Sequence, residues 1–120
     1  MARFAQSAKF IAKPGRGGKI VAALESALAA ASLEDGTLVY AIHRSTDHPD
    51  VVWMYELYAD PDAHWIHSVS TATSILRSAT ADLVAQPLSV VRGPVHQSFG
   101  LPGDSTARIL EQSRPSAGAN

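Results

Sequence analysis

Two stretches that alternate in the manner of β-strands, residues 37–45 and 51–58, are apolar on both of their faces. In the second stretch Trp53 and Tyr55 point to one side, and Met54 points to the other. An antiparallel hairpin with one face in water alternates cleanly between apolar and polar side chains. This hairpin does not, so we expect both faces of its sheet to be covered. A chain of 120 residues has a large surface for its volume, and the surplus apolar face therefore predicts an oligomer.

Helical periodicity fills the sequence around this hairpin. After a glycine-rich break at residues 13–18, an apolar stripe predicts a helix over residues 20–31. Asp60 and Pro61 form a typical helix start, with an N-capping carboxylate followed by proline at the first helical position. Two further faces are predicted beyond this start, the first formed by Ala63, Ile66, His67 and Ser70 and the second by Ala72, Ile75, Leu76, Ala79 and Leu83.

Residues 2–13 and 86–96 complete the pattern as a first and a last strand. The order β-α-β-β-α-β predicts an α+β fold of the ferredoxin-like type with an antiparallel sheet. We expect one domain over residues 1–96. Residues 97–120 are expected to form a C-terminal extension that is partly flexible or packed on a partner subunit. Within it, residues 107–112 can form one helical turn, and a flexible tail follows.

The charge balance excludes several classes of partner. Ten basic side chains against eleven acidic ones leave a net charge of −1, which predicts no nucleic-acid or anionic-membrane surface. No apolar run approaches the roughly 20 residues that span a bilayer. The sequence has no cysteine, which excludes disulfides, thiolate nucleophiles and cysteine-based metal sites. The cytoplasm is the expected location.

Three segments together resemble the antibiotic biosynthesis monooxygenase family, whose members form dimeric α+β barrels. The first is a strand followed by Ala-Lys-Pro-Gly at residues 12–15 and a helix rich in alanine and leucine. The second, residues 36–45, is similar to the family's Gly-x-x-x-Tyr strand. The third, residues 55–67, resembles a Glu-x-Trp-x-Asp segment followed by a helix with an alanine and, four residues later, a histidine. Tyr58 stands where the family usually has tryptophan, and His64 where it usually has an aliphatic residue.

The resemblance implies a fold, a partner and a range of activities. In this family the helices cover one face of the sheet, a partner's sheet covers the other, and the ligand pocket lies between sheet and helices. Members include cofactor-free oxygenases that act on polyphenols or quinols, haem-degrading enzymes, and proteins without oxygenase activity. We therefore expect a homodimeric monooxygenase for a small aromatic, polyphenol or quinol-like substrate, without a cofactor. A non-oxygenase binding protein, an isomerase and a purely structural dimerisation module remain alternatives.

His67 is the candidate catalytic residue. A cofactor-free oxygenase must deprotonate its substrate, and a histidine facing the sheet can serve as the base. The alternative is a structural histidine that fixes its helix by bonding to a partner such as Glu56. His64, one turn earlier, is a candidate substrate contact.

A metal site and a haem site are alternative interpretations of the same histidines. His64 and His67 can meet at one metal only if His43, His96 or Glu56 supplies a third ligand, and the resemblance implies no metal. In a haem-degrading relative, His67 would be the axial ligand.

Aromatic rings on the hairpin supply candidate substrate contacts. Tyr40, Trp53, Tyr55 and Tyr58 can stack on a flat ligand where their side chains face the pocket, and would otherwise pack in the core or the dimer interface. Trp65 lies off the inward helix stripe, and we expect it to contact the partner or the C-terminal segment.

Two arginines near strand ends complete the set. Arg44 and Arg92 can neutralise a developing anion or remain solvated at the surface.

Overall fold

The computed structural model describes residues 2–104. Its elements are β1 (Phe4–Ile11), α1 (Gly17–Ala31), β2 (Thr37–Arg44), β3 (Val51–Tyr58), α2 (Pro61–Ser68), α3 (Thr71–Thr80) and β4 (Ser89–Pro94). Every strand lies within the range predicted from the sequence, and α1 begins one turn earlier than its apolar stripe.

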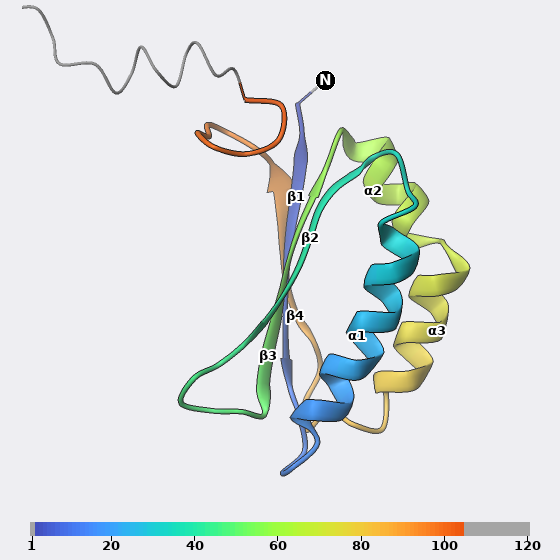
Figure 1. Cartoon of the computed structure of the whole chain (residues 1–120), viewed down its shortest axis with the longest axis vertical. Helices are drawn as coiled ribbons and strands as arrows, with labels where there is room; N and C mark the ends of the chain where they lie inside the picture. The colour runs from blue at the N-terminus through green and yellow to red at the C-terminus, as the bar shows by residue number, and fades with distance from the viewer. Residues whose placement is uncertain (1, 105–120) are drawn as a thin grey trace, which may run out of the picture.

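The strands form one antiparallel sheet in the order β2-β3-β1-β4. β1 is central because Ala8 lies opposite Met54 of β3 on one side and opposite Val90 of β4 on the other. The three helices of the described chain lie together on one side of this sheet (Figure 1). This is the predicted ferredoxin-like α+β arrangement.

Strand residues with even numbers point toward the helices and form the core. The buried cluster joins β1 and β3 to α1 and consists of Ala8, Phe10, Ala12, Ile20, Leu24, Val52 and Met54. Ile20, Leu24 and Val52 are fully buried, and each contributes about 1.5–3 kcal/mol through its burial. The apolar stripe predicted for the first helix is therefore the face of α1 that packs on the sheet.

The two short helices begin as the sequence indicates. The Asp60 carboxylate accepts a hydrogen bond from the backbone N–H of Ala63 at 2.8 Å, and Pro61 occupies the first turn, which confirms the predicted helix start. The Ser70 hydroxyl caps α3 by accepting from the N–H of Thr73 at 3.2 Å. These caps separate α2 from α3, so that each helix sets its own face against the sheet.

The apolar faces predicted for these helices were partly wrong. Ile66 of α2 and Ile75 of α3 are more than half exposed, whereas Thr80 is buried. The face of α3 turned to the sheet carries Thr73, Leu76 and Arg77, because a cavity rather than a filled core lies beneath this helix. A helix above a cavity can turn polar side chains inward, because the space beneath it is not a packed apolar core.

Strand residues with odd numbers form a face that no helix covers (Figure 1). Trp53 is 38 % exposed and Val91 is 73 % exposed on this face. The Trp53 ring stacks on His43 with centroids 5.0 Å apart and planes at 6°. The hairpin therefore has the two apolar faces expected from the sequence, one packed under helices and one that no helix covers. We call the second the bare face, although Leu57 on it is fully buried.

Residues beyond β4 return to the start of β1. The Arg3 guanidinium binds Asp104 at 2.8 Å, and the Ser98 hydroxyl donates to the same carboxylate at 2.8 Å. In Figure 1 this loop lies on the side of the sheet away from the helices. The helical turn predicted for residues 107–112 and the flexible tail after it lie outside the described residues, and the division at residue 96 stays a prediction. No helix in the described range is long and apolar enough to cross a membrane.

Candidate functional site

A cavity of about 550 Å³ lies between the sheet and the helices. All four strands and all three helices of the described chain contribute to its wall. Apolar side chains such as Phe10, Met54 and Leu76 form much of the lining, and the polar groups lie among them. Small-molecule sites in proteins have this size and mixture. A purely structural dimerisation module would have a filled core here, so the cavity argues against that alternative.

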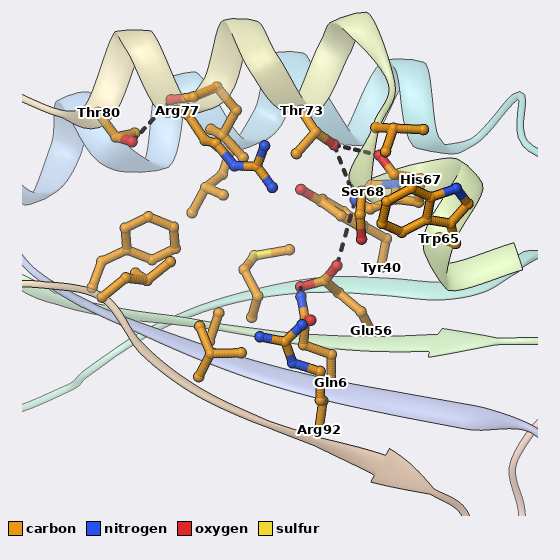
Figure 2. Close-up of a pocket in the computed structure, with 18 residues that line it drawn as sticks. Gln6, Tyr40, Glu56, Trp65, His67, Ser68, Thr73, Arg77, Thr80 and Arg92 are labelled. Carbon is orange, nitrogen blue, oxygen red and sulfur yellow. Dashed lines mark hydrogen bonds and ion pairs between the residues drawn. The ribbon is translucent and has the colours of Figure 1, made fainter. Parts of the chain in front are cut away.

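His67 lies in the wall of this cavity and is 7 % exposed. Its Nδ1 is 2.8 Å from Glu34 Oε1, and its Nε2 is 3.5 Å from Glu56 Oε1. A carboxylate only accepts hydrogen bonds, so Nδ1 carries a proton in its bond to Glu34. In the neutral imidazole the lone pair is then on Nε2, on the side toward Glu56 (Figure 2).

Glu34 is a partner that the sequence analysis missed, because it belongs to a turn between α1 and β2 that carried no motif. The Thr37 hydroxyl donates to Glu34 Oε1 at 2.8 Å and holds the carboxylate in place. Gly36 lets the turn approach α2, since a Cβ there would lie 2.5 Å from the Cβ of Ala63. The close approach at Gly36 therefore brings Glu34 to His67.

Glu56 is 4 % exposed and fully bonded within the cavity wall. Tyr58 donates its hydroxyl to Glu56 Oε1, and Gln6 donates its amide to Oε2 at 3.1 Å. Glu56 was the expected structural partner of His67. The structure makes Glu34 the short contact instead and places Glu56 at the opposite ring nitrogen.

Tyr40 and Tyr58 lie against the same imidazole. Their rings are 5.6 Å and 5.4 Å from the ring of His67. Burial raises the pKa of both phenols, and the nearby Glu56 carboxylate raises each pKa further. Both hydroxyls therefore stay protonated at neutral pH and can act only as neutral groups. Tyr40 lines the cavity, whereas Tyr58 is fully buried behind it with its hydroxyl committed to Glu56.

His64 lies one turn from His67 and outside the cavity lining. Its Nε2 is 2.9 Å from the side-chain oxygen of Gln6, and its ring contacts Phe4 and Tyr58. Burial lowers the pKa of His64, and the positive charge of Arg92 lowers it further. The predicted role of His64 as a direct substrate contact finds no support in this placement.

Trp53 and Tyr55 were predicted as substrate contacts, and the structure places both on the bare face of the sheet. Odd-numbered residues of β3 point away from the helices, so neither side chain reaches the cavity. Of the four hairpin aromatics, Tyr40 alone lines it. Trp65 of α2 lies at the rim of the cavity and is 66 % exposed. The contact with a partner or with the C-terminal segment that was expected for Trp65 stays a prediction.

The metal and haem alternatives can be tested on the same geometry. Within residues 2–104, no three histidine, aspartate or glutamate side chains are placed to hold one metal ion. An axial bond from His67 to haem iron would have to use Nε2, which lies 3.5 Å from Glu56 and 3.4 Å from the Thr73 hydroxyl. The imidazole is thus fixed at Nδ1 by Glu34, and its Nε2 faces the Glu56 carboxylate and the Thr73 hydroxyl in the cavity wall, an arrangement suited to proton transfer.

Polar residues of the wall that the sequence analysis missed come from α3 and β1. Thr73 and Arg77 share one face of α3 with Leu76, and Gln6 lies on β1 beside Glu56. The spacing of Thr73, Arg77 and Thr80 on one helical face was the available signal. The apolar periodicity of this helix indicated a different inward face, so the polar spacing did not enter the prediction.

Comparisons with known proteins agree with the fold. A protein from Nitrosomonas europaea, provisionally named an antibiotic biosynthesis monooxygenase, superposes with a TM-score of 0.74 at 19 % identity, over 78 % of this chain and 99 % of that one. A Mycobacterium tuberculosis protein gives 0.74 at 22 % identity, over 82 % and 100 % of the two chains. A Shewanella oneidensis protein gives 0.71 at 25 % identity, over 77 % and 89 %.

No protein with a curated functional description is significantly similar to the chain. The family model for antibiotic biosynthesis monooxygenase, however, matches residues 3–73, which run from β1 into α3 and include Glu34, Glu56 and His67. The match covers more than half of the sequence and the whole histidine site, which consists of His67, Glu34 and Glu56. The chain therefore belongs to the antibiotic biosynthesis monooxygenase family.

Proposed function

We propose that the protein is a cofactor-independent monooxygenase that acts on a small aromatic, polyphenol or quinol-like substrate. The observation that carries this proposal is the placement of His67 in the wall of a cavity of about 550 Å³, with Glu34 at Nδ1 and Glu56 near Nε2. The cavity accommodates a flat molecule of two or three rings. Membership of the family supports the oxygenase chemistry over other uses of the same groups.

The proton step follows from the tautomer of His67. With Nδ1–H donated to Glu34, Nε2 accepts the hydroxyl proton of the substrate. The imidazolium that forms lies between two carboxylates, at 2.8 Å and 3.5 Å, and both stabilise its charge. Tyr40 stays protonated, so its hydroxyl can donate a hydrogen bond to a substrate oxygen.

The oxygen step needs no further reductant. The phenolate transfers one electron to dioxygen. The superoxide that forms then bonds to a ring carbon at which the phenoxyl radical carries spin density. The resulting ring peroxide loses its C–H proton and cleaves the O–O bond, which leaves a quinone. The hydroxide released takes the proton from His67, so one oxygen atom enters the product and the other becomes water.

We propose that the active unit is a homodimer joined through the bare face of the sheet. Trp53 and Val91 expose apolar surface there, and a second sheet packed on it would cover both. Family members generally form such dimers. The cytoplasmic location expected from the sequence stays a prediction.

Oxygen consumption with 1,4-naphthoquinol tests the function. We expect turnover above the rate of autoxidation, and His67→Ala should lower kcat by about 10²–10⁴-fold because it removes the base. His48→Ala, in the exposed loop between β2 and β3, is the matched control and should retain full activity. Circular dichroism of both variants checks that the fold is unchanged.

Two results would contradict the proposal. Unchanged turnover in a folded His67→Ala variant would remove this residue from the mechanism. Substrate turnover without oxygen would instead support the isomerase alternative, which uses the same proton transfer at Nε2 but forms no carbon–oxygen bond.

A further inference from the structure

Two arginines reach into the cavity from opposite walls. Arg77 comes from α3 and Arg92 from β4, and Figure 2 shows both side chains directed at the space between helix and sheet. Among residues 2–104, neither guanidinium forms an ion pair or donates a hydrogen bond. Both residues are exposed, so water solvates their charges.

The acidic residue of the cavity wall does not neutralise these charges. Glu56 already accepts hydrogen bonds from Tyr58 and Gln6 and faces Nε2 of His67. The wall therefore carries two kinds of polar group. Proton-accepting groups gather around His67, and two cations without an ion-pair partner among the described residues come from α3 and β4, with Arg92 on the same row of the sheet as Gln6 and Glu56.

A ligand that fills the cavity displaces water from these guanidiniums. A neutral aromatic ring would leave both cations poorly solvated against an apolar surface, which costs free energy. A carboxylate or another planar oxyanion would instead form charge-assisted hydrogen bonds with the guanidinium groups, whose fork geometry matches it. The charge of Arg92 is already felt inside the protein, because it contributes to the lowered pKa of His64.

We infer that the ligand is an aromatic acid, whose anionic group binds Arg77 and Arg92 while its hydroxyl faces His67. Apolar side chains of the cavity wall, Phe10, Met54 and Leu76 among them, would contact the ring system. This inference names the substrate class of the proposed monooxygenase and rests on that function for the role of the hydroxyl. The arginine pair itself is a feature of binding and can be tested without turnover.

Calorimetric titration with three naphthalene probes separates the contribution of the carboxylate from that of the hydroxyl. 6-Hydroxy-2-naphthoate carries the hydroxyl and the carboxylate at opposite ends, whereas 2-naphthol and 2-naphthoate each carry one of them. We expect the hydroxy acid to bind about tenfold or more tightly than 2-naphthol, with an affinity that falls as salt is added. 2-Naphthyl phosphate, as a fourth probe, distinguishes a carboxylate site from a phosphate site.

Substitutions assign the effect to the arginines. Arg77→Gln and Arg92→Gln should each weaken binding of the hydroxy acid by about five- to tenfold, and the double variant by about 30- to 100-fold. Binding of 2-naphthol should change by less than about twofold, since it has no group for the arginines. Arg16→Gln, at the start of α1 and outside the cavity wall, is the matched control and should bind all probes as the parent does.

The outcomes separate this inference from the proposed function. Carboxylate selectivity that disappears with the two arginines supports the inference even where no oxygen is consumed. Equal affinities for 2-naphthol and the hydroxy acid overturn it, and they leave the monooxygenase intact where neutral naphthols are oxidised. Tighter binding of the phosphate than of either acid replaces the carboxylate with a phosphate ester. Failure of all four probes to bind overturns the inference, whereas oxygen consumption with 1,4-naphthoquinol decides the monooxygenase separately.

Discussion

The two faces of the sheet are built from the same strands but differ in what covers them. On β3, Met54 is 1 % exposed under the helices, while its neighbour Trp53 is 38 % exposed on the bare face. The covered face contains the core and the cavity with every group of the histidine site. The bare face contains stacked and exposed side chains, among them Trp53 against His43 and the exposed Val91. One face is therefore suited to chemistry and the other to association.

A charge placed on the bare face gives the largest expected effect. Trp53→Glu should weaken the proposed dimer by about 100- to 1000-fold, because it replaces a central aromatic contact with a carboxylate that must be desolvated. Sedimentation equilibrium measures the change. Ile75→Glu, which places the same charge at an exposed apolar residue of α3 outside the cavity wall, is the control and should leave association unchanged. Equal dissociation constants for the parent and Trp53→Glu would place the interface elsewhere.

Truncation on the covered face should act on folding instead. Met54→Ala should lower the free energy of unfolding by about 2–3 kcal/mol, the low end for a buried methionine, because one side of Met54 already borders the cavity. Urea denaturation at several protein concentrations measures it. A loss of dimerisation with unchanged unfolding free energy would reverse the roles assigned to the two faces.

A substitution of Glu34 tests whether this carboxylate positions His67 on the covered face. Glu34→Gln keeps the size of the side chain but removes the charge that fixes Nδ1–H and stabilises the imidazolium. We expect kcat to fall by about 10- to 100-fold while KM changes little. Glu25→Gln, on the exposed side of α1, is the control. A purely structural Glu34 would instead lower stability and leave the pH dependence of kcat unchanged.

The smallest effect concerns the electrostatics of the same face. Arg92→Gln removes a positive charge that disfavours the protonated form of His64, so the pKa of His64 should rise toward its ordinary value. Burial of the ring, which is the larger cause, persists and keeps the pKa lowered. Glu56 and His67 are the other ionisable groups that act on this ring. An NMR titration of the imidazole measures the change, and an unchanged pKa would place Arg92 too far away to act on the site.

Local patterns predicted the elements well, because alternation and helix caps depend on neighbouring residues. The strand at Val51–Tyr58 and the helix start at Asp60 are confirmed by the structure. His67 was singled out correctly as a residue of the cavity wall. The predictions failed where a face had to be chosen, as for Trp53 and Tyr55 on the sheet.

The partners of His67 could not be found in the same way. Glu34 is 33 residues away in sequence and meets the histidine only because Gly36 allows its turn to approach α2. Arg77 was not predicted as a cavity residue, because the apolar residues of α3 were expected to form its inward face. A helix above a cavity does not follow that rule, since the space beneath it can be filled by a ligand and by water.

The sequence by itself determined the order of the elements, the antiparallel α+β fold and the presence of two apolar faces on one hairpin. These follow from periodicity and turn chemistry, which act between residues close in the chain. The tertiary structure decided which face is covered and which side chains surround the imidazole. Only the packing of three helices on one side of the sheet distinguishes its two faces, and contacts such as that between Glu34 and His67 exist only once distant segments are brought together.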